Sequence, residues 1–321
     1  MEKIESNGDV WCRVLQGDKL SSHRGINLPG LRVSLPSISE KDYGDIDFAV
    51  KQDIDFLALS FVQCADDVRQ LKDYLSQKGA DIPVIAKIER QNAFDDIEAI
   101  VREANGVMVA RGDLALEIIP VITATQMLES MIDMRKPTRA EATDVTNAIL
   151  DGTDALMLSA ETAIGRYPVE TVAIMSTLAV STETAWFGGK LSGALPFSPP
   201  REIEPAVAYA GNLVANTVSA KAIVAYTASG MTAGRVVCHR PQQPVLALAA
   251  SSKVQRRLAL TWGVQSALAK IIKETDDIVA VALNEVQRYG LAGKGDTIVI
   301  IAGTPPHGQS GRTNTLKVER V

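Results

Sequence analysis

The sequence predicts an α/β protein whose first large domain is a parallel sheet covered by helices. Apolar runs at 56–62 and 83–89 flank an amphipathic stretch at 65–78, and this alternation of strand and helix is typical of parallel sheets. Three apolar runs also end in charged or hydroxyl-bearing residues, namely 84–89, 107–114 and 121–126. Polar groups at the C-terminal ends of apolar parallel strands favour a (β/α) barrel.

The predicted barrel domain spans residues 27–188. Its five expected strands are 56–62, 83–89, 106–111, 121–125 and 155–159, and its expected helices are 65–78, 93–104 and 143–150. The first two helices carry apolar residues at helical spacing. Those of the first share one face and are Val68, Leu71, Tyr74 and Leu75, and those of the second are expected to face inward and are Phe94, Ile97, Ile100 and Val101. Eight strands close a barrel of this kind, so five strands predict an incomplete one.

A second, smaller α/β domain is predicted at 189–321, after a stretch rich in Gly, Pro and Ser at 188–200. Its expected helices are 205–218, 231–239 and 278–289, and its expected strands are 222–226, 245–249, 297–302 and 315–318. These strands predict a mixed, mostly parallel sheet. Residues 1–26 fit neither domain, contain short extended pieces such as 10–15, and are predicted to be the remnant of another domain.

Composition excludes several classes of protein. The net charge of −5 gives no electrostatic case for nucleic acid as a partner. The three cysteines and three histidines are scattered, so neither a disulfide framework nor a zinc site is expected. No apolar run approaches the roughly 18 residues of a membrane span, and the first residues lack the apolar core of a secretory signal. We therefore expect a cytoplasmic location.

Lys87 and Glu89 are two residues apart on an expected strand, so their side chains share one face. A cation and a carboxylate at one strand end suit phosphoryl transfer, because the cation offsets developing charge and the carboxylate can hold Mg²⁺. The alternative is a surface salt bridge at a strand end.

Gly112 and Asp113 follow the next expected strand. Gly112 allows close approach of a ligand to the backbone, and Asp113 is a candidate second Mg²⁺ ligand. In the alternative interpretation Asp113 caps a helix, with Glu117 at the capping-box position. Both interpretations can hold together.

Thr123 and Thr125 lie two apart at the end of the third run. A hydroxyl there can bind a substrate carboxylate or relay a proton. The alternative is a pair of β-branched residues that serve strand packing. The conjunction of three polar strand ends at one sheet edge is more specific than any one of them.

Five stretches in this order resemble pyruvate kinase: KIE, MVARGDL, ATQMLESM, KPTRAEATDV and DGTDALMLSAET. The resemblance runs from HRGINLPG (23–30) to TNTLKV (313–318). It implies a (β/α)₈ barrel with an inserted lid domain and a C-terminal α/β domain. It also implies the glycolytic transfer of a phosphoryl group from phosphoenolpyruvate to ADP, giving pyruvate and ATP, with Mg²⁺ and K⁺.

The resemblance assigns roles to individual residues. Lys87 matches the lysine that neutralises the phosphoryl group and the enolate oxygen, and Glu89 and Asp113 match the two protein ligands of Mg²⁺. Gly112 and Asp113 match backbone contacts to the substrate carboxylate, and Thr125 completes that pocket.

Other matched positions lie farther along the chain. Ser159 matches a serine near the proposed proton path to the enolate. Arg139 and Glu141 match a stretch near a subunit interface of a homotetramer. A different barrel enzyme acting on a phosphorylated acid is the other catalytic reading of the same motifs.

The second domain contains a predicted phosphate-type loop at 226–232. Its candidate effector-binding residues are Thr227, Ser229, Gly230 and Thr232. By resemblance such a loop binds phosphorylated effectors, and 303–311 closes over it. Ala228 stands where forms activated by a bisphosphate often carry Lys, so a monophosphate effector or none fits better. The alternative is an ordinary strand-to-helix turn capped by Ser.

The chain also departs from the family pattern. Only nine residues, 112–120, lie between the expected strand that ends near Arg111 and the one that starts at Val121, whereas parallel neighbours need a crossover of about a dozen residues. By resemblance, a barrel helix, the first three barrel strands and most of the lid domain are absent, and residues 1–26 are the last strands of that lid domain. The absent strands carry the family's substrate arginine and its K⁺ ligands. Turnover is therefore expected to be severely reduced or absent, and the alternative function is a non-catalytic subunit or fragment retaining the association and effector domain.

Overall fold

The computed structural model describes residues 2–5, 9–15, 37–89, 91–110, 119–124, 126–190, 200–269, 275–303 and 312–321. The chain divides into two units, 1–36 and 37–321. In the first unit β1 (Lys3–Ile4) and β2 (Val10–Trp11) pair as an antiparallel hairpin. This confirms extended structure within 10–15. The assignment of 1–26 to a lid domain, and the boundaries 27–188 and 189–321, remain predictions.

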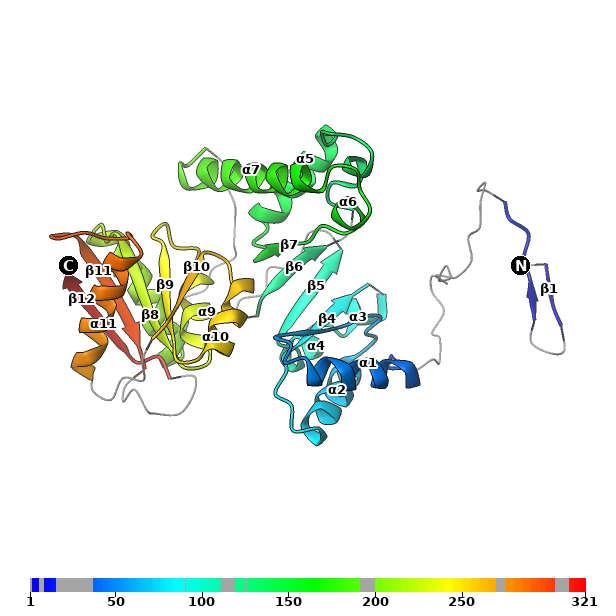
Figure 1. Ribbon diagram of the computed structural model, residues 1–321, viewed down its shortest axis with the longest axis horizontal. Helices are drawn as coiled ribbons and strands as arrows, with labels where there is room; N and C mark the ends of the chain where they lie inside the picture. Colours follow the sequence, from blue (N-terminus) through cyan, green and yellow to red (C-terminus); the bar gives the residue numbers. More distant parts are fainter. Residues whose placement is uncertain are drawn as a thin grey trace. The chain divides into compact units, whose positions relative to one another are not determined.

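The first sheet of the second unit has five strands in the order β3-β4-β5-β6-β7, and all four pairings are parallel (Figure 1). Its strands are β3 (Leu57–Leu59), β4 (Val84–Ile88), β5 (Gly106–Ala110), β6 (Val121–Ala124) and β7 (Ala155–Leu156). The prediction of a partial barrel sheet with five strands is confirmed. The last strand is shorter than the expected 155–159, and its residues are half-buried.

Eight helices accompany this sheet in the described residues. They are α1 (Glu40–Lys51), α2 (Ala65–Gln77), α3 (Gln91–Asp95), α4 (Ile97–Glu103), η1 (Glu129–Ile132), α5 (Arg139–Leu150), α6 (Ala160–Ala163) and α7 (Pro168–Phe187). Sequence analysis missed α1, although Ser39 and Asp42 form a capping box at its start. It also missed α7, whose residues are apolar on most sides and give little helical periodicity.

The predicted helix 93–104 is two helices, α3 and α4, that meet at Asp96. The Asp96 carboxylate accepts the backbone N–H of Ala65, 2.9 Å away, and so serves the start of α2. The prediction that Phe94 faces inward is wrong, since this residue is 52% exposed. Ile100 is fully buried, as expected.

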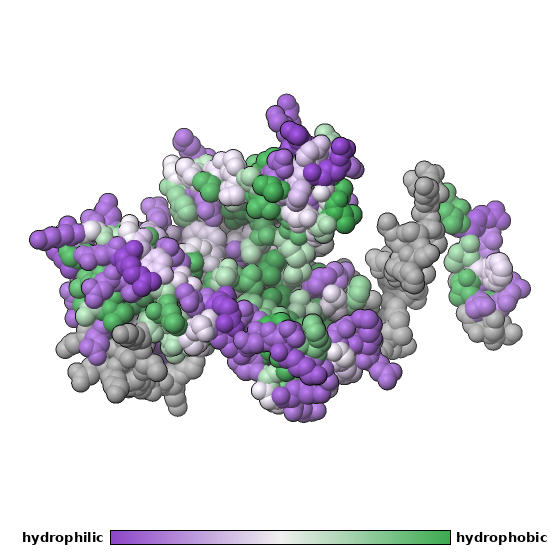
Figure 2. All heavy atoms as spheres, viewed as in Figure 1, coloured by the Kyte–Doolittle hydropathy of each residue, from purple (hydrophilic) through white to green (hydrophobic). Residues whose placement is uncertain are grey.

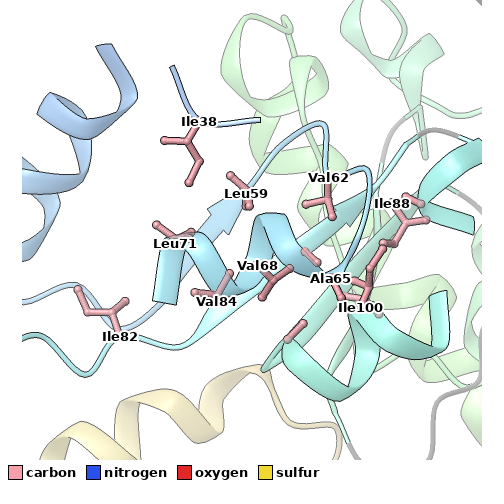
Figure 3. Packing of buried hydrophobic residues seen from close by; sticks show 14 of the residues in the cluster. Ile38, Leu59, Val62, Ala65, Val68, Leu71, Ile82, Val84, Ile88 and Ile100 are labelled. Atoms are coloured by element: carbon pink, nitrogen blue, oxygen red, sulfur yellow. The ribbon is translucent and has the colours of Figure 1, made fainter. Parts of the chain in front are cut away.

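The main core of this region lies between the sheet and helices α1, α2 and α4 (Figure 3). Helix α2 buries Val68, Leu71 and Leu75 against Val84 on β4, each at most 2% exposed. Full burial of one such side chain contributes about 2 kcal/mol. The predicted apolar stripe of α2 is therefore confirmed, with Tyr74 at its partly buried margin.

The opposite face of the sheet carries a smaller apolar cluster, Ile85, Met108, Ile122 and Ala124. Figure 2 shows hydrophobic residues gathered over this sheet at the centre of the view. Because side chains alternate along a strand, Lys87 follows Ile85 on this face, whereas Val84 and Ala86 belong to the main core. The first polar pair therefore lies on the face away from α2.

The connection between β5 and β6 is short for parallel neighbours. The two strands are in register from Val107 opposite Val121 to Ala110 opposite Ala124. Ten residues, 111–120, connect the end of β5 to the start of β6. A Cβ on Gly106 would lie 3.1 Å from the carbonyl oxygen of Pro120, so the end of this connection packs tightly on β5. Residues 111–118 lie outside the described residues.

The second sheet has the order β10-β9-β8-β11-β12, parallel except for the antiparallel pair β11–β12. Its strands are β8 (Ala222–Thr227), β9 (Val245–Ala249), β10 (Val264–Leu268), β11 (Thr297–Ala302) and β12 (Thr315–Arg320). Its helices are α8 (Ile203–Thr217), α9 (Met231–Val237), α10 (Ser252–Arg257), η2 (Leu258–Leu260) and α11 (Thr275–Arg288). The mixed, mostly parallel sheet is confirmed, whereas β10 and α10 were not predicted.

An apolar core covers each face of the second sheet. On one face, α8 packs so closely that a Cβ on Gly211 would lie 2.3 Å from Cδ1 of Ile301. Among the described helices none is both long enough and apolar enough to cross a membrane.

Candidate functional site

The side chains of Lys87 and Glu89 meet at the C-terminal end of β4. Lys87 Nζ lies 2.9 Å from Glu89 Oε1 and donates to Ser60 Oγ at 3.3 Å. The two charged side chains are 23% and 26% exposed, so each reaches water but is not freely solvated. Ser60 directly follows β3, and sequence analysis did not select it. The signal was present, since Ser60 is the polar residue inside the apolar run 56–62.

Two residues close to the ends of β3 and β6 have unusual backbone conformations. Phe61 and Gln126 adopt left-handed backbone conformations, with φ of 59° and 52°. Such conformations cost about 1 kcal/mol or more for residues other than glycine, and they concentrate at functional sites. Both residues lie at the sheet edge that also carries Lys87.

Three of the predicted site residues, Gly112, Asp113 and Thr125, lie outside the described residues. The strand ends that precede them are described. Ala110 of β5 is paired with Ala124 of β6, so both strands end level with each other at one edge of the sheet. The assigned roles of the three residues remain predictions.

Ser159 is exposed and occupies the N-cap position of α6. Its backbone N–H donates to Oε2 of Glu161 at 2.7 Å, and Oε1 of the same carboxylate accepts the backbone N–H of Leu128 at 3.1 Å. Glu161 is only 2% exposed. This buried carboxylate therefore joins the segments that follow β6 and β7, and sequence analysis missed it because nothing in its spacing predicts burial.

Thr123 does not belong to the polar edge. It is 3% exposed, and its hydroxyl lies 3.0 Å from the hydroxyl of Thr153. Thr153 Oγ1 also lies 3.0 Å from the carbonyl oxygens of Val121 and Ala155. For Thr123, the alternative of a packing role is the one the structure supports.

Glu89 is suited to hold a divalent cation. Mg²⁺ keeps several waters and needs only one or two protein carboxylates together with substrate phosphates. Glu89 directly follows β4 and offers a partly exposed carboxylate next to the Lys87 ammonium. The described residues contain no group of three or more His, Cys, Asp or Glu that could hold a metal ion.

The predicted effector loop uses most of its hydroxyls internally. Thr227 Oγ1 accepts the N–H of Gly230 at 2.9 Å, and the hydroxyls of Thr232 and Thr313 lie 3.0 Å apart. Ser229 is exposed, and Gly230, with φ of 95°, is the N-cap of α9 without a side-chain cap. The alternative of Ser capping is therefore wrong, and effector binding by Thr227, Ser229, Gly230 and Thr232 remains a prediction.

A surface cavity of about 600 Å³ lies elsewhere, between α1 and α2. It is lined by Tyr43, Asp66, Arg69, Gln70, Asp73, Tyr74 and Gln77. It is remote from the strand ends that carry the polar groups. Lys87 and Glu89 lie on the other face of the sheet, so the polar strand edge is the better candidate site.

Two protein-family models match the chain. The model of the pyruvate kinase barrel domain matches residues 1–120 and 119–172, and the model of the pyruvate kinase alpha/beta domain matches residues 205–319. The barrel match breaks at 119–120, at the end of the short connection between β5 and β6.

Curated relatives named pyruvate kinase align with nearly the whole chain. Pyruvate kinase 2 of Synechocystis is 41% identical over 333 residues, which covers 98% of this chain and 56% of the relative. The Geobacillus stearothermophilus protein is 42% identical over 332 residues, 97% and 56% of the two chains. The Mycobacterium tuberculosis H37Rv protein is 40% identical over 337 residues, 98% and 70%.

These alignments are longer than the 321 residues of the chain, so the relatives contain residues without a counterpart here. The chain spans little more than half the length of the first two relatives. The two domain models together match most of the chain, and the M. tuberculosis relative is 40% identical and covered over 70% of its length. The chain therefore belongs to the pyruvate kinase family.

Proposed function

We propose that the polar edge of the first sheet is the phosphoenolpyruvate- and metal-binding part of a pyruvate kinase site. The protein would serve phosphoryl transfer from phosphoenolpyruvate to ADP, giving pyruvate and ATP. The observation that supports this most strongly is the cluster of Lys87, Glu89 and Ser60 at the ends of β3 and β4. It places a cation, a carboxylate and a hydroxyl within hydrogen-bonding reach on one rigid sheet face.

Lys87 would offset the negative charge of the transferred phosphoryl group. Its ammonium is held by Glu89 and Ser60, so little ordering remains to be done when the substrate arrives. Glu89 would hold Mg²⁺, with Asp113 as second ligand by resemblance, and the ion would supply positive charge against the phosphate oxygens. K⁺ is a family expectation without proposed ligands in this chain.

The remaining roles follow the family resemblance. Gly112 and Asp113 would contact the substrate carboxylate through the backbone, and Thr125 would complete that pocket. Ser159 would stand near the proton path to the enolate carbon. Ser159 is an exposed residue whose backbone N–H donates to Glu161.

A second candidate function is a non-catalytic family member that retains an association or effector domain. The observation in its favour is the C-terminal sheet, which has five strands and a buried core on both faces. In this case the chain would assemble with other copies of itself into a homotetramer and would bind a phosphorylated effector. It would not bind phosphoenolpyruvate.

Titration of the protein with Mn²⁺, followed by its electron paramagnetic resonance signal, tests the proposed metal site. We expect Mn²⁺ binding that weakens about tenfold or more in Glu89→Gln and is unchanged in Glu98→Gln, an exposed carboxylate on α4. Equal binding by both variants would contradict the role of Glu89.

Turnover is measured separately, by coupling pyruvate formation from phosphoenolpyruvate and ADP to NADH oxidation. Turnover by the wild-type chain that is lost in Lys87→Met would support the proposed phosphoryl transfer from phosphoenolpyruvate to ADP. Metal and phosphoenolpyruvate binding without turnover would confine the proposal to binding. If the chain shows neither binding of metal and phosphoenolpyruvate nor turnover, the association or effector function is favoured.

A further inference from the structure

Arg240, which follows α9 in the C-terminal domain, is buried against the turn that precedes β7. Its Nη2 donates to the carbonyl oxygens of Gly152 and Thr153, the latter at 3.1 Å, and to Oδ1 of Asp154 at 3.3 Å. The Arg240 side chain is 7% exposed and that of Asp154 is 15% exposed. The guanidinium also lies 4.5 Å from the centre of the Trp262 ring. One arginine therefore holds three acceptors of a single turn.

The same turn is bonded to β6 on its other side. Thr153 Oγ1 lies 3.0 Å from Thr123 Oγ1 and accepts the Thr123 N–H at 3.2 Å. The Asp154 N–H donates to the Val121 carbonyl oxygen, and the Val121 N–H donates to Asp154 Oδ2, both at 2.9 Å. The turn held by Arg240 thus fixes the start of β6 as well as the start of β7.

These two strands lead to the proposed site. β6 ends at Ala124, immediately before Thr125, and β7 is followed by Ser159. We infer that Arg240 is a positioning residue, which fixes the register of β6 and β7 and thereby the strand ends that carry Thr125 and Ser159. This inference rests on the proposed function for its second part, the effect on the site.

The surroundings of Arg240 are specialised for this task. Its backbone has φ of 46°, a left-handed conformation that glycine or asparagine adopts more readily. Burial raises the pKa of Asp154. The charge of Arg240 and the backbone N–H groups of Val121 and Trp262 oppose this rise. Trp262, beneath the guanidinium, donates through Nε1 to Glu183 of α7 at 2.7 Å.

Arg256 of α10 provides a matched comparison. It also joins the C-terminal domain to a loop before a barrel strand, through Asp55 at 2.9 Å and Asp53 at 3.2 Å. Arg256 is 43% exposed and Asp53 76%, so this contact is solvated and contributes little. Removing Arg256 deletes a contact between the same domains without touching the turn at 152–154.

Hydrogen exchange measured by mass spectrometry tests the inference on the whole chain without ligand. In Arg240→Met we expect exchange about tenfold faster or more in peptides covering 119–128 and 150–160, because the amides of Val121, Asp154 and Met157 lose their fixed partners. Peptides covering 222–227 and 245–249 in the second sheet should keep the wild-type rate. Arg256→Met should match wild type in all four.

A general loss of stability would accelerate exchange in the second sheet as much as in β6 and β7, and this result would overturn the inference. Unchanged exchange in Arg240→Met would do the same. If Arg240→Met does not fold, Arg240→Gln replaces it. Glutamine is polar but shorter and uncharged, so it cannot reach the turn with a charged donor, and the same local acceleration is expected.

Phosphoenolpyruvate binding in the presence of Mg²⁺, measured by calorimetry on the same variants, tests the effect on the site. We expect the Kd to rise about tenfold in Arg240→Met and not in Arg256→Met. Faster local exchange with an unchanged Kd would overturn the link to the site. If wild type binds no phosphoenolpyruvate, the proposed function fails, and the exchange experiment alone decides whether Arg240 positions the two strands.

Discussion

Lys87 Nζ on β4 lies 2.9 Å from Oε1 of Glu89, the residue that directly follows this strand. In Lys87→Met we expect the affinity for phosphoenolpyruvate with Mg²⁺ to fall about tenfold or more, because a charge-assisted contact to the phosphoryl group is lost. Isothermal titration calorimetry measures the change.

Lys78→Met is the control for that variant. Lys78 pairs with Asp47 at 2.8 Å, away from the strand ends, and is 39% exposed. It should bind phosphoenolpyruvate as wild type does. If both lysine variants lose affinity equally, the effect is one of overall charge and Lys87 has no specific role.

Glu141 accepts four hydrogen bonds where η1 meets α5. They come from the N–H and hydroxyl of Ser130, at 2.7 and 2.5 Å, and from those of Thr138, at 2.7 and 2.9 Å. Burial raises the pKa of Glu141, but these hydrogen bonds outweigh it and hold the pKa below its ordinary value of 4.5. A lowered pKa in the folded state adds stability above about pH 4.5, and that stability is lost as the pH falls through the folded pKa.

We therefore expect Glu141→Gln to reduce the free energy of unfolding at pH 7 by about 1–2 kcal/mol, and to weaken the loss of stability on acidification. Urea unfolding followed by circular dichroism at pH 7 and pH 4 measures both. Glu98→Gln, at an exposed carboxylate, should leave both values near wild type. An acid dependence of Glu141→Gln identical to that of wild type would contradict the assignment.

Gly211 and Gly234 are helical glycines with opposite surroundings. A Cβ on Gly211 would lie 2.3 Å from Ile301 Cδ1, whereas nothing lies within 4 Å of a Cβ on Gly234. Both alanine variants gain the same helix propensity, about 1 kcal/mol, so their difference isolates the contact. We expect Gly211→Ala to be less stable than Gly234→Ala by about 1–3 kcal/mol in thermal unfolding. Equal stability would show that Ile301 moves without cost.

Glu161 joins the segments after β6 and β7 through the N–H groups of Leu128 and Ser159. In Glu161→Ala both donors lose their partner in a buried place, which costs about 1–3 kcal/mol for each. Glu161→Gln retains a carbonyl oxygen and should lose less. Differential scanning fluorimetry of the two variants compares them, and equal losses would indicate that the carboxylate charge matters more than the acceptor geometry.

The sheet of the first domain could be predicted because its strands are continuous apolar runs between helical patterns. Val84 to Ile88 and Val121 to Ala124 are buried almost throughout, so their composition alone identifies them. Helix α7 could not be found in this way, because its apolar residues surround the helix and hide its period. An inward position for Phe94 requires one continuous helix over 93–104. The structure instead has two helices that meet at Asp96, whose carboxylate binds the start of α2.

The candidate site, like the fold, could be predicted only where a local sequence pattern specifies it. The pairing of Lys87 with Glu89 follows from their spacing of two on a strand, and it could be predicted. Ser60 stands out in the sequence as the polar residue inside the run 56–62, but its contact with Lys87 depends on which strands become neighbours. The burial of Glu161 has no such local signal, because it depends on which turns come together. The contacts of Arg240 with the turn at 152–154 join residues more than 80 positions apart, and no local pattern encodes them.

The central claim is that the polar edge of the first sheet binds phosphoenolpyruvate through Lys87 and a metal held by Glu89. Calorimetric titration of the whole chain with phosphoenolpyruvate, with Mg²⁺ and after its removal by EDTA, tests this most directly. We expect binding that requires Mg²⁺ and is weakened about tenfold or more in Glu89→Gln. Metal-independent binding, or equal affinity in wild type and Glu89→Gln, would contradict it.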